Sequence, residues 1–589
     1  MITSGKLWYK KEIPILFLIA ASTWIASIHH VGEVVSIWNQ NDELGAWQGA
    51  AWLLGLDWSE VVSQNNFYGH GYGFLLAPFL LLFGNNTILM TRIAICFQAL
   101  MHSACLFIAW YCIRRLFPDA SATERIIGST VCIMSIPDLF YNYFFFSESI
   151  LRVIIWGYTA FLVSYYYKKK WYKLLVLGCI SVFAFSVHQR CILLLAWTIL
   201  ILVFEIICNH RDRRIVLGLL FAASIIVLFY CLEYKLLQGE YIGTMYSRDG
   251  KDSVGGNLLS ERGITLSWII KDILLNAETH GIAVQNTMGM VYYIGAIDCG
   301  LFFWGIIFCL NTIKQSIVGR KELQPQVLFM FLVIVTGVLL TSYINTGDSV
   351  YERVEIMHYG RYCSYLFPPM IMLGVMHLIT KRDMKPAYNS AFVILMVYLI
   401  GGISTSYVLK THDVNNLFAF RNACPGIANE YLRSAPYDAV MYYTQRGAIL
   451  MTILFMAVTA SRAMIRHNRI VLILPFVFFV SLWTYVADKE ALEQYNMQKA
   501  YVESTYDLQK VLNEEKEFIA YKSYSYGSGL LQYNNPFSKV NVRRTLEEFG
   551  DADKGLLVVS QKGIDDIGVI LGNYPLEYEN ERYIIWRYI

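Results

Sequence analysis

The chain has 589 residues, of which 56% are hydrophobic and only 16% are charged. Soluble domains carry about 25% charged residues, so the composition excludes an ordinary soluble protein and indicates an integral membrane protein. The net charge of +3 is small and the basic residues form short, separate clusters, which excludes nucleic acid as a partner.

The first apolar segment, residues 13–30, follows three lysines. We interpret it as a retained signal anchor with its N-terminus in the cytoplasm. Apolar runs of the roughly 17–25 residues needed to cross a bilayer then recur along the chain. About thirteen spans are predicted in all: 13–30, 88–113, 124–144, 150–167, 172–188, 190–208, 215–234, 288–310, 326–344, 364–380, 389–408, 447–463 and 469–486.

Basic clusters follow alternate spans. They occur at Arg114–Arg115, Lys168–Lys170 with Lys173, Arg211–Arg214, Lys314–Lys321, Lys381–Lys385 and Arg462–Arg469. The excess of Lys and Arg on cytoplasmic connections places these clusters inside, and an odd number of spans places the C-terminus outside. Aromatic residues flank many of the runs, as is typical of rings seated among lipid head groups, so membrane lipids are expected partners.

The longer connections are predicted to face outward: 31–87, 235–287, 345–363, 409–446 and a tail from about 487. Within 31–87, the stretches AWQGAAWLLGL and YGFLLAPFLLLFG are apolar but interrupted by Gly, Trp and Pro, which favours interfacial helices. In the tail, residues 490–513 are predicted to form an amphipathic helix, and EFIAYK, GLLVVS and RYIIWRY are predicted as short strands. We therefore divide the chain into a transmembrane domain, 1–486, and an extracytoplasmic α/β domain, 487–589, which acts as a cap or has a binding role.

The twelve cysteines nearly all lie inside apolar runs, and no C-x-x-C spacing occurs. This pattern predicts buried free thiols rather than a disulfide framework or a zinc site.

Acidic side chains at the ends of spans are the first candidates for chemistry, because carboxylates near a bilayer are costly. Asp42 and Glu43 follow the first span, and Asp42 could equally cap a helix beginning at Glu43. Glu148 lies at the outer end of the third span, where an ion pair with Arg152 one helical turn later is the structural alternative. Carboxylates in these positions suit a general base.

Cationic side chains are predicted on the same membrane face. His188 and Arg190 form a tight outer turn, and His358, Arg361 and Tyr362 enter the tenth span from outside. Such arginines either extend to lipid phosphates or form part of a site for a phosphate leaving group.

The order of these parts resembles the GT-C superfamily of polyprenyl-phosphate-sugar-dependent glycosyltransferases, in particular its protein O-mannosyltransferase and lipid A aminoarabinose transferase branch. The similarity lies in NDELGAWQGAAWLLG, then NFYGHGYGFLLAPFLLLFGN, then TILMTRIAI leading to Arg114–Arg115, then FFFSES, and finally GRY before Pro368–Pro369. It covers roughly residues 10–380. The chain departs from the family in having HQR at the outer turn and in its tail.

The resemblance implies a GT-C-like, polytopic α-helical membrane protein that transfers a sugar from a polyprenyl-phosphate donor to a hydroxyl of an envelope glycan, lipid or protein. Transfer would occur with inversion at the outer face of a bacterial plasma membrane. Asp42 would be the general base, and Arg361, with His358, Tyr362, Arg190 and His188, would bind the donor phosphate. Glu43 and Glu148 would orient the acceptor or bind a divalent cation, and the sequence commits to neither.

Two other function classes stay open at this stage. A polysaccharide polymerase or O-antigen-ligase-like enzyme would use pyrophosphate-linked glycans through similar external Arg and His residues. A lipid-linked sugar transporter or flippase would need polar groups near the middle of the membrane, for which His102 and Asp298 are candidates.

Overall fold

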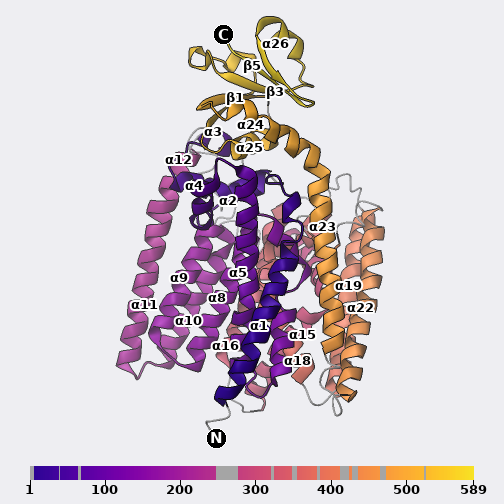
Figure 1. Ribbon diagram of the computed structural model, residues 1–589. Helices are drawn as coiled ribbons and strands as arrows, with labels where there is room; N and C mark the ends of the chain where they lie inside the picture. The colour runs from indigo at the N-terminus through magenta and orange to yellow at the C-terminus, as the bar shows by residue number, and fades with distance from the viewer. Residues whose placement is uncertain are drawn as a thin grey trace.

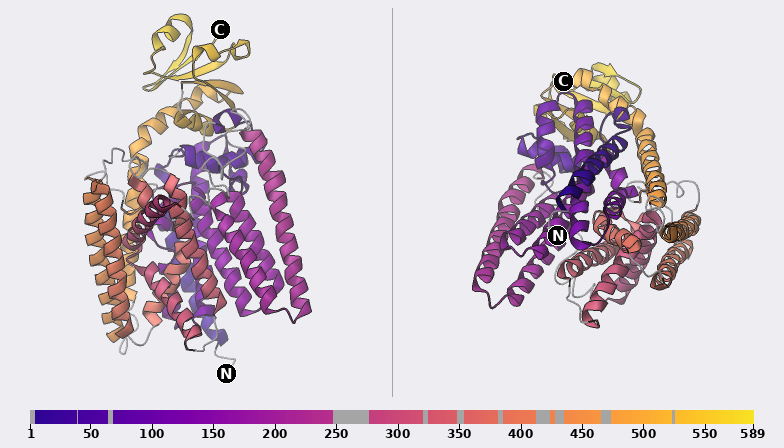
Figure 2. Two further views of the ribbon diagram at one scale, coloured as in Figure 1. Left: turned by 180° about the vertical axis from the view of Figure 1, so that it is seen from behind. Right: turned by 60° about the horizontal axis from the view of Figure 1, so that its bottom comes forward.

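The computed structural model is an elongated bundle of helices with a small sheet domain at one end (Figure 1). It describes residues 5–38, 40–63, 68–246, 276–319, 324–347, 354–380, 385–411, 424–427, 435–464, 473–522 and 525–589. Parts of the predicted outer segments 31–87, 235–287, 345–363 and 409–446, and of the basic clusters from residue 314 onward, lie outside these ranges. The N-terminus and the C-terminal domain lie at opposite ends of the bundle in both views (Figures 1 and 2).

The first half of the chain forms the long helices on one side of the bundle. They are α1 (Gly5–Ser27), α5 (Thr87–Leu116), α8 (Ser147–Tyr167), α9 (Trp171–Val187), α10 (Ile192–Cys208) and α11 (Arg213–Leu232). Shorter helices accompany them: α2 (Gln40–Leu53), α3 (Ser59–Val62), α4 (Gly73–Phe83), α6 (Ala122–Val131), α7 (Ile136–Phe140) and α12 (Gln238–Met245). Of these, α2, α3, α4 and α12 gather at the end that carries the C-terminal domain (Figure 1).

The second half supplies the remaining helices of the bundle. They are α14 (Ala277–Asp298), α15 (Leu301–Ile317), α16 (Pro325–Ile344), α17 (Arg361–Ser364), α18 (Phe367–Thr380), α19 (Lys385–Thr411), α22 (Pro436–Met464) and α23 (Ile473–Asp507). The helices α19, α22 and α23 lie together on the side opposite α11 (Figure 1).

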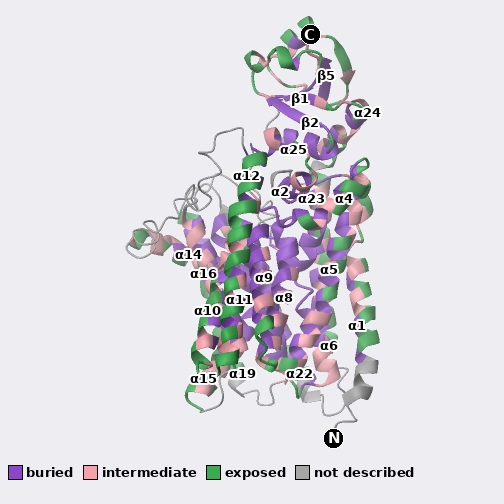
Figure 3. Cartoon of the chain, turned by 90° about the vertical axis from the view of Figure 1, so that its left-hand side faces the viewer, coloured by how far each residue is buried: buried purple, intermediate pink, exposed green. Residues whose placement is uncertain are grey.

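Within the described residues, seven helices are long and apolar enough to cross a membrane, or up to nine if each of two bent helix pairs counts as one span. This supports a multi-pass membrane protein, but the number differs from the thirteen predicted. Apolar side chains along α11 remain exposed: Leu217 is 66% exposed and Leu228 is 58% exposed. Figure 3 shows this exposed helix beside the buried α8 and α9. Such a surface suits a hydrocarbon solvent rather than water.

The predicted span 124–144 is wrong as a single helix. The helix α6 ends at Val131, and α7 begins at Ile136 with Pro137 in its first turn. Proline lacks the backbone N–H of a helical hydrogen bond and disfavours helical geometry in the residue before it, so Pro137 favours the start of a new helix here. The chain continues as a 3₁₀ turn over Tyr141–Tyr143 and irregular backbone before α8, which brings polar backbone groups to the start of that helix.

The predicted span 288–310 is also broken, because α14 and α15 meet at an angle of 109°. Cys299 and Gly300 both have positive φ, at 53° and 77°, which ends one helix and starts the next. The carboxylate of Asp298 accepts the backbone N–H groups of Gly300 at 2.8 Å and Phe302 at 2.9 Å. Asp298, a transporter candidate on sequence, therefore caps a helix. A second bend, of 84°, separates residues 356–364 from α18.

The last membrane helix continues into the C-terminal domain. The sequence predicts a span to residue 486 and a separate amphipathic helix from 490, but α23 is one helix of 35 residues, followed by α24 (Gln509–Leu512). The domain then contains β1 (Glu517–Tyr521), α25 (Ser525–Asn534), β2 (Lys539–Arg543), β3 (Leu557–Gln561), α26 (Ile567–Asn573), β4 (Leu576–Glu579) and β5 (Tyr583–Arg587). This confirms a small α/β domain.

The five strands form one sheet in the order β2-β1-β3-β5-β4. The strand β1 pairs in parallel with β2 and β3, whereas β5 runs antiparallel to β3 and β4. The sequence patterns predicted β1, β3 and β5 but missed β2 and β4. The central strands are apolar and buried, whereas β4 is a largely exposed edge strand, LEYE.

The C-terminal domain docks on the segment between α1 and α5. Tyr533 of α25 packs its ring against Trp47 of α2 at 5.5 Å between centroids and shares a hydrogen bond of 2.7 Å with Thr91. Trp58 donates its indole N–H to the carbonyl of Pro536 at 2.9 Å. The helix α2 is thereby held between the bundle and this domain.

Candidate active site

Asp42 and Arg361 form an ion pair although 319 residues separate them. Asp42 lies in the first turn of α2, and Arg361 is the first residue of α17. The Nη1 atom of Arg361 donates to Oδ2 of Asp42 at 2.5 Å, and the hydroxyl of Tyr68 donates to Oδ1. Both carboxylate oxygens of Asp42 are thus oriented by donors, and the side chain keeps 18% exposure.

Glu148 extends this ion pair to a second arginine. Its Oε2 accepts from Nε of Arg361 at 3.2 Å, and its Oε1 accepts from Nη2 of Arg190. Glu148 is 0% exposed. We call the four residues Asp42, Arg361, Glu148 and Arg190 the charged cluster. Its two carboxylates and two guanidinium groups balance in charge, as buried charges must.

Arg190 has hydrogen-bond donors that no residue in the described part of the chain accepts. Its Nη2 also reaches the hydroxyl of Ser147 at 3.3 Å, and its guanidinium lies over the rings of Tyr362 and Tyr365, at 4.9 and 5.5 Å from the centroids. Its Nε and Nη1 atoms are buried, and neither has a hydrogen-bond partner within the ranges that the structure describes. A buried donor without an acceptor costs free energy. A ligand with hydrogen-bond acceptors that entered here could bind both of these N–H groups.

Local backbone geometry places both arginines. Gly360 precedes Arg361 where a Cβ atom would lie 1.8 Å from Cε1 of Tyr293, so only glycine allows this approach of the turn to α14. At the other arginine, His188 ends α9 and its Nδ1 accepts the backbone N–H of Arg190 at 3.4 Å. This tight turn presents Arg190 at the start of the next helix.

The structure places three of the predicted residues differently. Glu43 is buried, and its carboxylate accepts the backbone N–H groups of Trp38 at 2.7 Å and Phe145 at 3.0 Å. It therefore joins α2 to the irregular segment before α8. His358 is buried with its ring edge-on to Tyr292 at 6.0 Å, and His188 acts in the turn. Tyr362 contacts the cluster through its ring.

The alternative pairing of Glu148 with Arg152 does not form between side chains. Arg152 is fully buried and directs its guanidinium to Asp138 and to Oδ1 of Asn142. Only its Nε reaches Glu148, at the backbone carbonyl, 3.3 Å away. The break at Pro137 brings Asp138 close to Arg152. The pairing of Glu148 with Arg152, expected from their spacing of four residues along one helix, therefore does not form between the side chains.

Sequence reasoning missed two residues that contact the cluster. Tyr68 donates to Asp42, and burial together with the negative charge of Asp42 raises the pKa of Tyr68 well above its ordinary value. Phe146 lies under Arg361, with the guanidinium carbon 4.1 Å from the ring centroid. A weak signal was present for each, because Tyr68 lies in the Gly-rich stretch after α3 and Phe146 precedes Glu148 by two residues.

The sequence left open whether the two acids orient the acceptor or bind a divalent cation. Asp42 and Glu148 direct their oxygens to arginines, so in the described part of the chain these two acids do not present a preformed ligand set. A separate cavity of about 320 Å³ opens between α14, α22 and α23, lined in part by Tyr443, Arg446, Trp483 and Lys489. None of the four cluster residues lines it.

No family model matches the chain, and no curated protein matches it. Among solved structures, the fold is similar to that of ArnT from Cupriavidus metallidurans bound to undecaprenyl phosphate, with a TM-score of 0.51 at 12% sequence identity over 98% of this chain and 97% of that chain. The apo state of the same protein gives the same TM-score and identity over 99% and 98%.

A weaker similarity, with a TM-score of 0.42 at 11% identity, links 94% of this chain to 70% of AglB, the oligosaccharyltransferase of Archaeoglobus fulgidus, in complex with an inhibitory peptide and a dolichol-phosphate. Identities this low concern the fold alone. The similarity to ArnT extends over almost the whole of both chains, and it confirms at the level of fold the resemblance found in the sequence motifs. This chain is a multi-pass membrane protein with the GT-C fold.

Proposed function

We propose that this protein is an integral membrane glycosyltransferase that moves a sugar from a polyprenyl-phosphate donor to a hydroxyl group of an envelope glycan, lipid or protein. The observation that carries this proposal is the charged cluster, in which the partly exposed carboxylate of Asp42 pairs with Arg361, and the buried Glu148 joins Arg361 to Arg190. The fold adds support, since the ArnT structure it resembles is bound to undecaprenyl phosphate.

Asp42 is the general base in this proposal. Of the two carboxylates in the cluster, Asp42 is 18% exposed and Glu148 is 0% exposed, so only Asp42 can be approached by an acceptor. It would remove the proton of the acceptor hydroxyl while that oxygen attacks the anomeric carbon of the sugar. The bond from that carbon to the phosphate oxygen breaks, and the configuration inverts because attack and departure occur on opposite faces.

Arg190 and Arg361 stabilise the leaving phosphate. Nε and Nη1 of Arg190 have no hydrogen-bond partner among the described residues, and a guanidinium matches the geometry of phosphate oxygens. Departure adds one negative charge to the phosphate while Asp42 loses its own charge on protonation. Arg361 can therefore transfer its interaction from Asp42 to the phosphate, and the total charge of the buried site does not change during the reaction. Such preorganised donors act where charge develops.

The reaction is proposed to occur on the extracytoplasmic face of a bacterial plasma membrane. The short helix α2, which carries Asp42, lies at the end of the bundle with the C-terminal domain (Figure 1). The N-terminus lies at the opposite end, where the basic residues Arg114 and Arg115 end α5. An excess of basic residues is typical of the cytoplasmic side, so the N-terminus is assigned to the cytoplasm and the site to the outside.

The test compares Asp42→Asn with wild type in proteoliposomes supplied with polyprenyl-monophosphate sugars and an envelope extract as acceptor. Release of polyprenyl phosphate and transfer of labelled sugar are both measured. We expect wild type to transfer sugar and Asp42→Asn to lose about 10²–10⁴-fold in rate, as is typical when a general base is removed. Asp119→Asn makes the same chemical change at an exposed site after α5 and serves as the control.

A turnover by Asp42→Asn equal to that of wild type would exclude Asp42 as the base. Transfer only from pyrophosphate-linked glycans would instead favour a polymerase or ligase. Movement of labelled lipid across the bilayer without sugar transfer would favour a flippase.

A further inference from the structure

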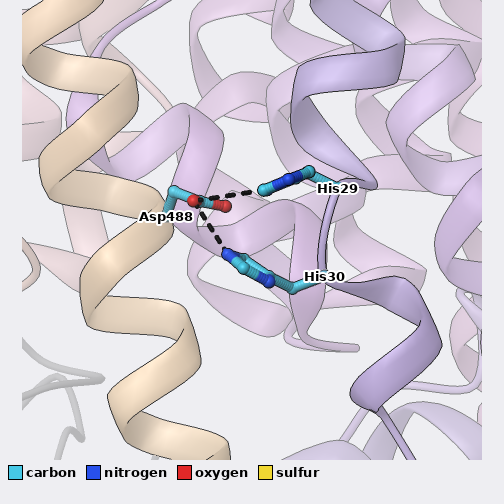
Figure 4. Close-up of side chains that lie close together, drawn as sticks. All are labelled: His29, His30 and Asp488. Carbon is cyan, nitrogen blue, oxygen red and sulfur yellow. Dashed lines mark hydrogen bonds and ion pairs between the residues drawn. The ribbon is translucent and has the colours of Figure 1, made fainter.

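Three side chains that could hold a metal ion meet where α1 ends and α23 passes it. Figure 4 shows the imidazoles of His29 and His30 directed at the carboxylate of Asp488. Nε2 of His30 lies 2.9 Å from Oδ2 of Asp488, and Nδ1 of His29 lies 3.6 Å from the same oxygen. The two histidines are adjacent in the chain, whereas Asp488 lies 458 residues after His30, so the fold brings the carboxylate to them.

The spacing of the three ligand atoms suits a small tetrahedral ion. Bonds of about 2.0–2.2 Å from zinc to nitrogen and oxygen place two ligand atoms roughly 3.3–3.5 Å apart in a tetrahedron. The two measured separations, 2.9 and 3.6 Å, lie on either side of this range, and all three ligand atoms lie within 4.8 Å of one another. Only small side-chain movements are therefore needed to place one ion among them.

Neighbouring groups orient two of the three candidate ligands. Nδ1 of His30 lies 2.9 Å from Oε1 of Glu33, and the hydroxyl of Tyr143 donates to Oδ1 of Asp488 at 3.2 Å. A carboxylate on the far nitrogen of a histidine is the common support of zinc-ligating imidazoles. His29 is 67% exposed, which leaves an open side through which an ion and a water molecule as fourth ligand can enter.

We propose that His29, His30 and Asp488 bind one zinc ion that links the end of α1 to α23. Two imidazole nitrogens and one carboxylate oxygen favour zinc over calcium or magnesium, which prefer oxygen ligands alone. None of these residues belongs to the charged cluster. The ion would fix α23 near the point from which it extends to the C-terminal domain, and this role does not depend on the proposed glycosyltransfer.

The test uses the full-length protein in detergent after treatment with a chelator and removal of the chelator. Zinc is titrated while bound metal per chain and the apparent melting temperature are measured. Cobalt serves as a spectroscopic probe, because its visible absorption reports tetrahedral coordination. His29→Asn is the principal variant, since this side chain is largely exposed. His210→Asn, at an exposed histidine after α10, is the matched control.

We expect wild type and His210→Asn to bind one more zinc per chain than His29→Asn or Asp488→Asn, and to gain melting temperature on zinc addition. Glu33→Ala should weaken zinc affinity by about 10–100-fold, the usual effect of removing a group that supports a ligand. The proposal is overturned if wild type binds no zinc, or if His29→Asn and Asp488→Asn retain its stoichiometry and affinity.

Discussion

Glu148→Gln removes the one carboxylate that contacts both arginines of the charged cluster, and it changes the shape of the side chain little. Oε1 of Glu148 accepts from Arg190 and Oε2 accepts from Arg361 at 3.2 Å. A glutamine carbonyl can accept from one arginine, but its NH₂ group would face the other. Arg361 keeps Asp42 as a partner, whereas the described residues give Arg190 no second carboxylate.

The magnitude follows from this asymmetry. Removing one partner of a buried ion pair costs about 3–5 kcal/mol, because the other charge stays buried and uncompensated. The hydroxyl of Ser147 and the two tyrosine rings still contact Arg190. We therefore expect a loss near the lower limit, about 3 kcal/mol in the free energy of unfolding.

Denaturation in mixed micelles, followed by tryptophan fluorescence, measures this loss from the midpoint and slope of the transition. Glu240→Gln on α12 is exposed and should change the free energy by less than about 0.5 kcal/mol. A second measurement is the affinity for polyprenyl phosphate, which should rise in Glu148→Gln because the anion replaces the missing charge. Wild-type stability in Glu148→Gln, combined with unchanged affinity, would refute the idea that Glu148 neutralises the two arginines.

Three further changes test other contacts. Tyr68→Phe removes a donor to Asp42 and should lower kcat about tenfold. Because burial and Asp42 raise the pKa of Tyr68, its hydroxyl stays protonated and the loss in kcat should be the same between about pH 6 and 9. A loss that changes with pH would contradict this. Gly360→Ala places a Cβ atom against Tyr293 and should lower the free energy of unfolding, measured by denaturation, by about 1–3 kcal/mol. An unchanged free energy of unfolding would mean that the turn adapts to the methyl group. Tyr533→Ala should lower the free energy of unfolding by about 3–5 kcal/mol and make the C-terminal domain more susceptible to protease. Cleavage of this variant at the wild-type rate would show that docking of the domain does not need the ring of Tyr533.

Matched controls exist for two of these variants. Gly243→Ala on α12 adds a methyl group where nothing lies within 4 Å, so it should not lower stability and should raise the free energy of unfolding by up to about 1 kcal/mol. Val569→Ala, at a position 54% exposed on α26, removes apolar atoms from the same domain as Tyr533 without touching the interface.

Much of the architecture follows from short-range patterns in the sequence. Long apolar runs predicted α5, α8, α9, α10 and α11 within a few residues, because a bilayer demands about 20 apolar residues in one helix. The strands β1, β3 and β5 were predicted from buried apolar runs. The breaks near Pro137 and at Cys299–Gly300 were missed, since mean hydropathy does not register a local change of backbone direction.

The sequence by itself determined the chemical types at the candidate site and the membrane face on which they were expected. Asp42, Glu148, Arg190 and Arg361 stand out because charge is rare at the ends of apolar spans. Only the tertiary structure decided which of them pair. Arg152 is nearer to Glu148 in the chain than Arg190 or Arg361, yet Glu148 binds those two, because the break at Pro137 offers Arg152 a different carboxylate. The same holds for His29, His30 and Asp488, which become neighbours only when α23 packs beside the end of α1. Pairing over such separations depends on helix packing, and no local pattern in the sequence records it.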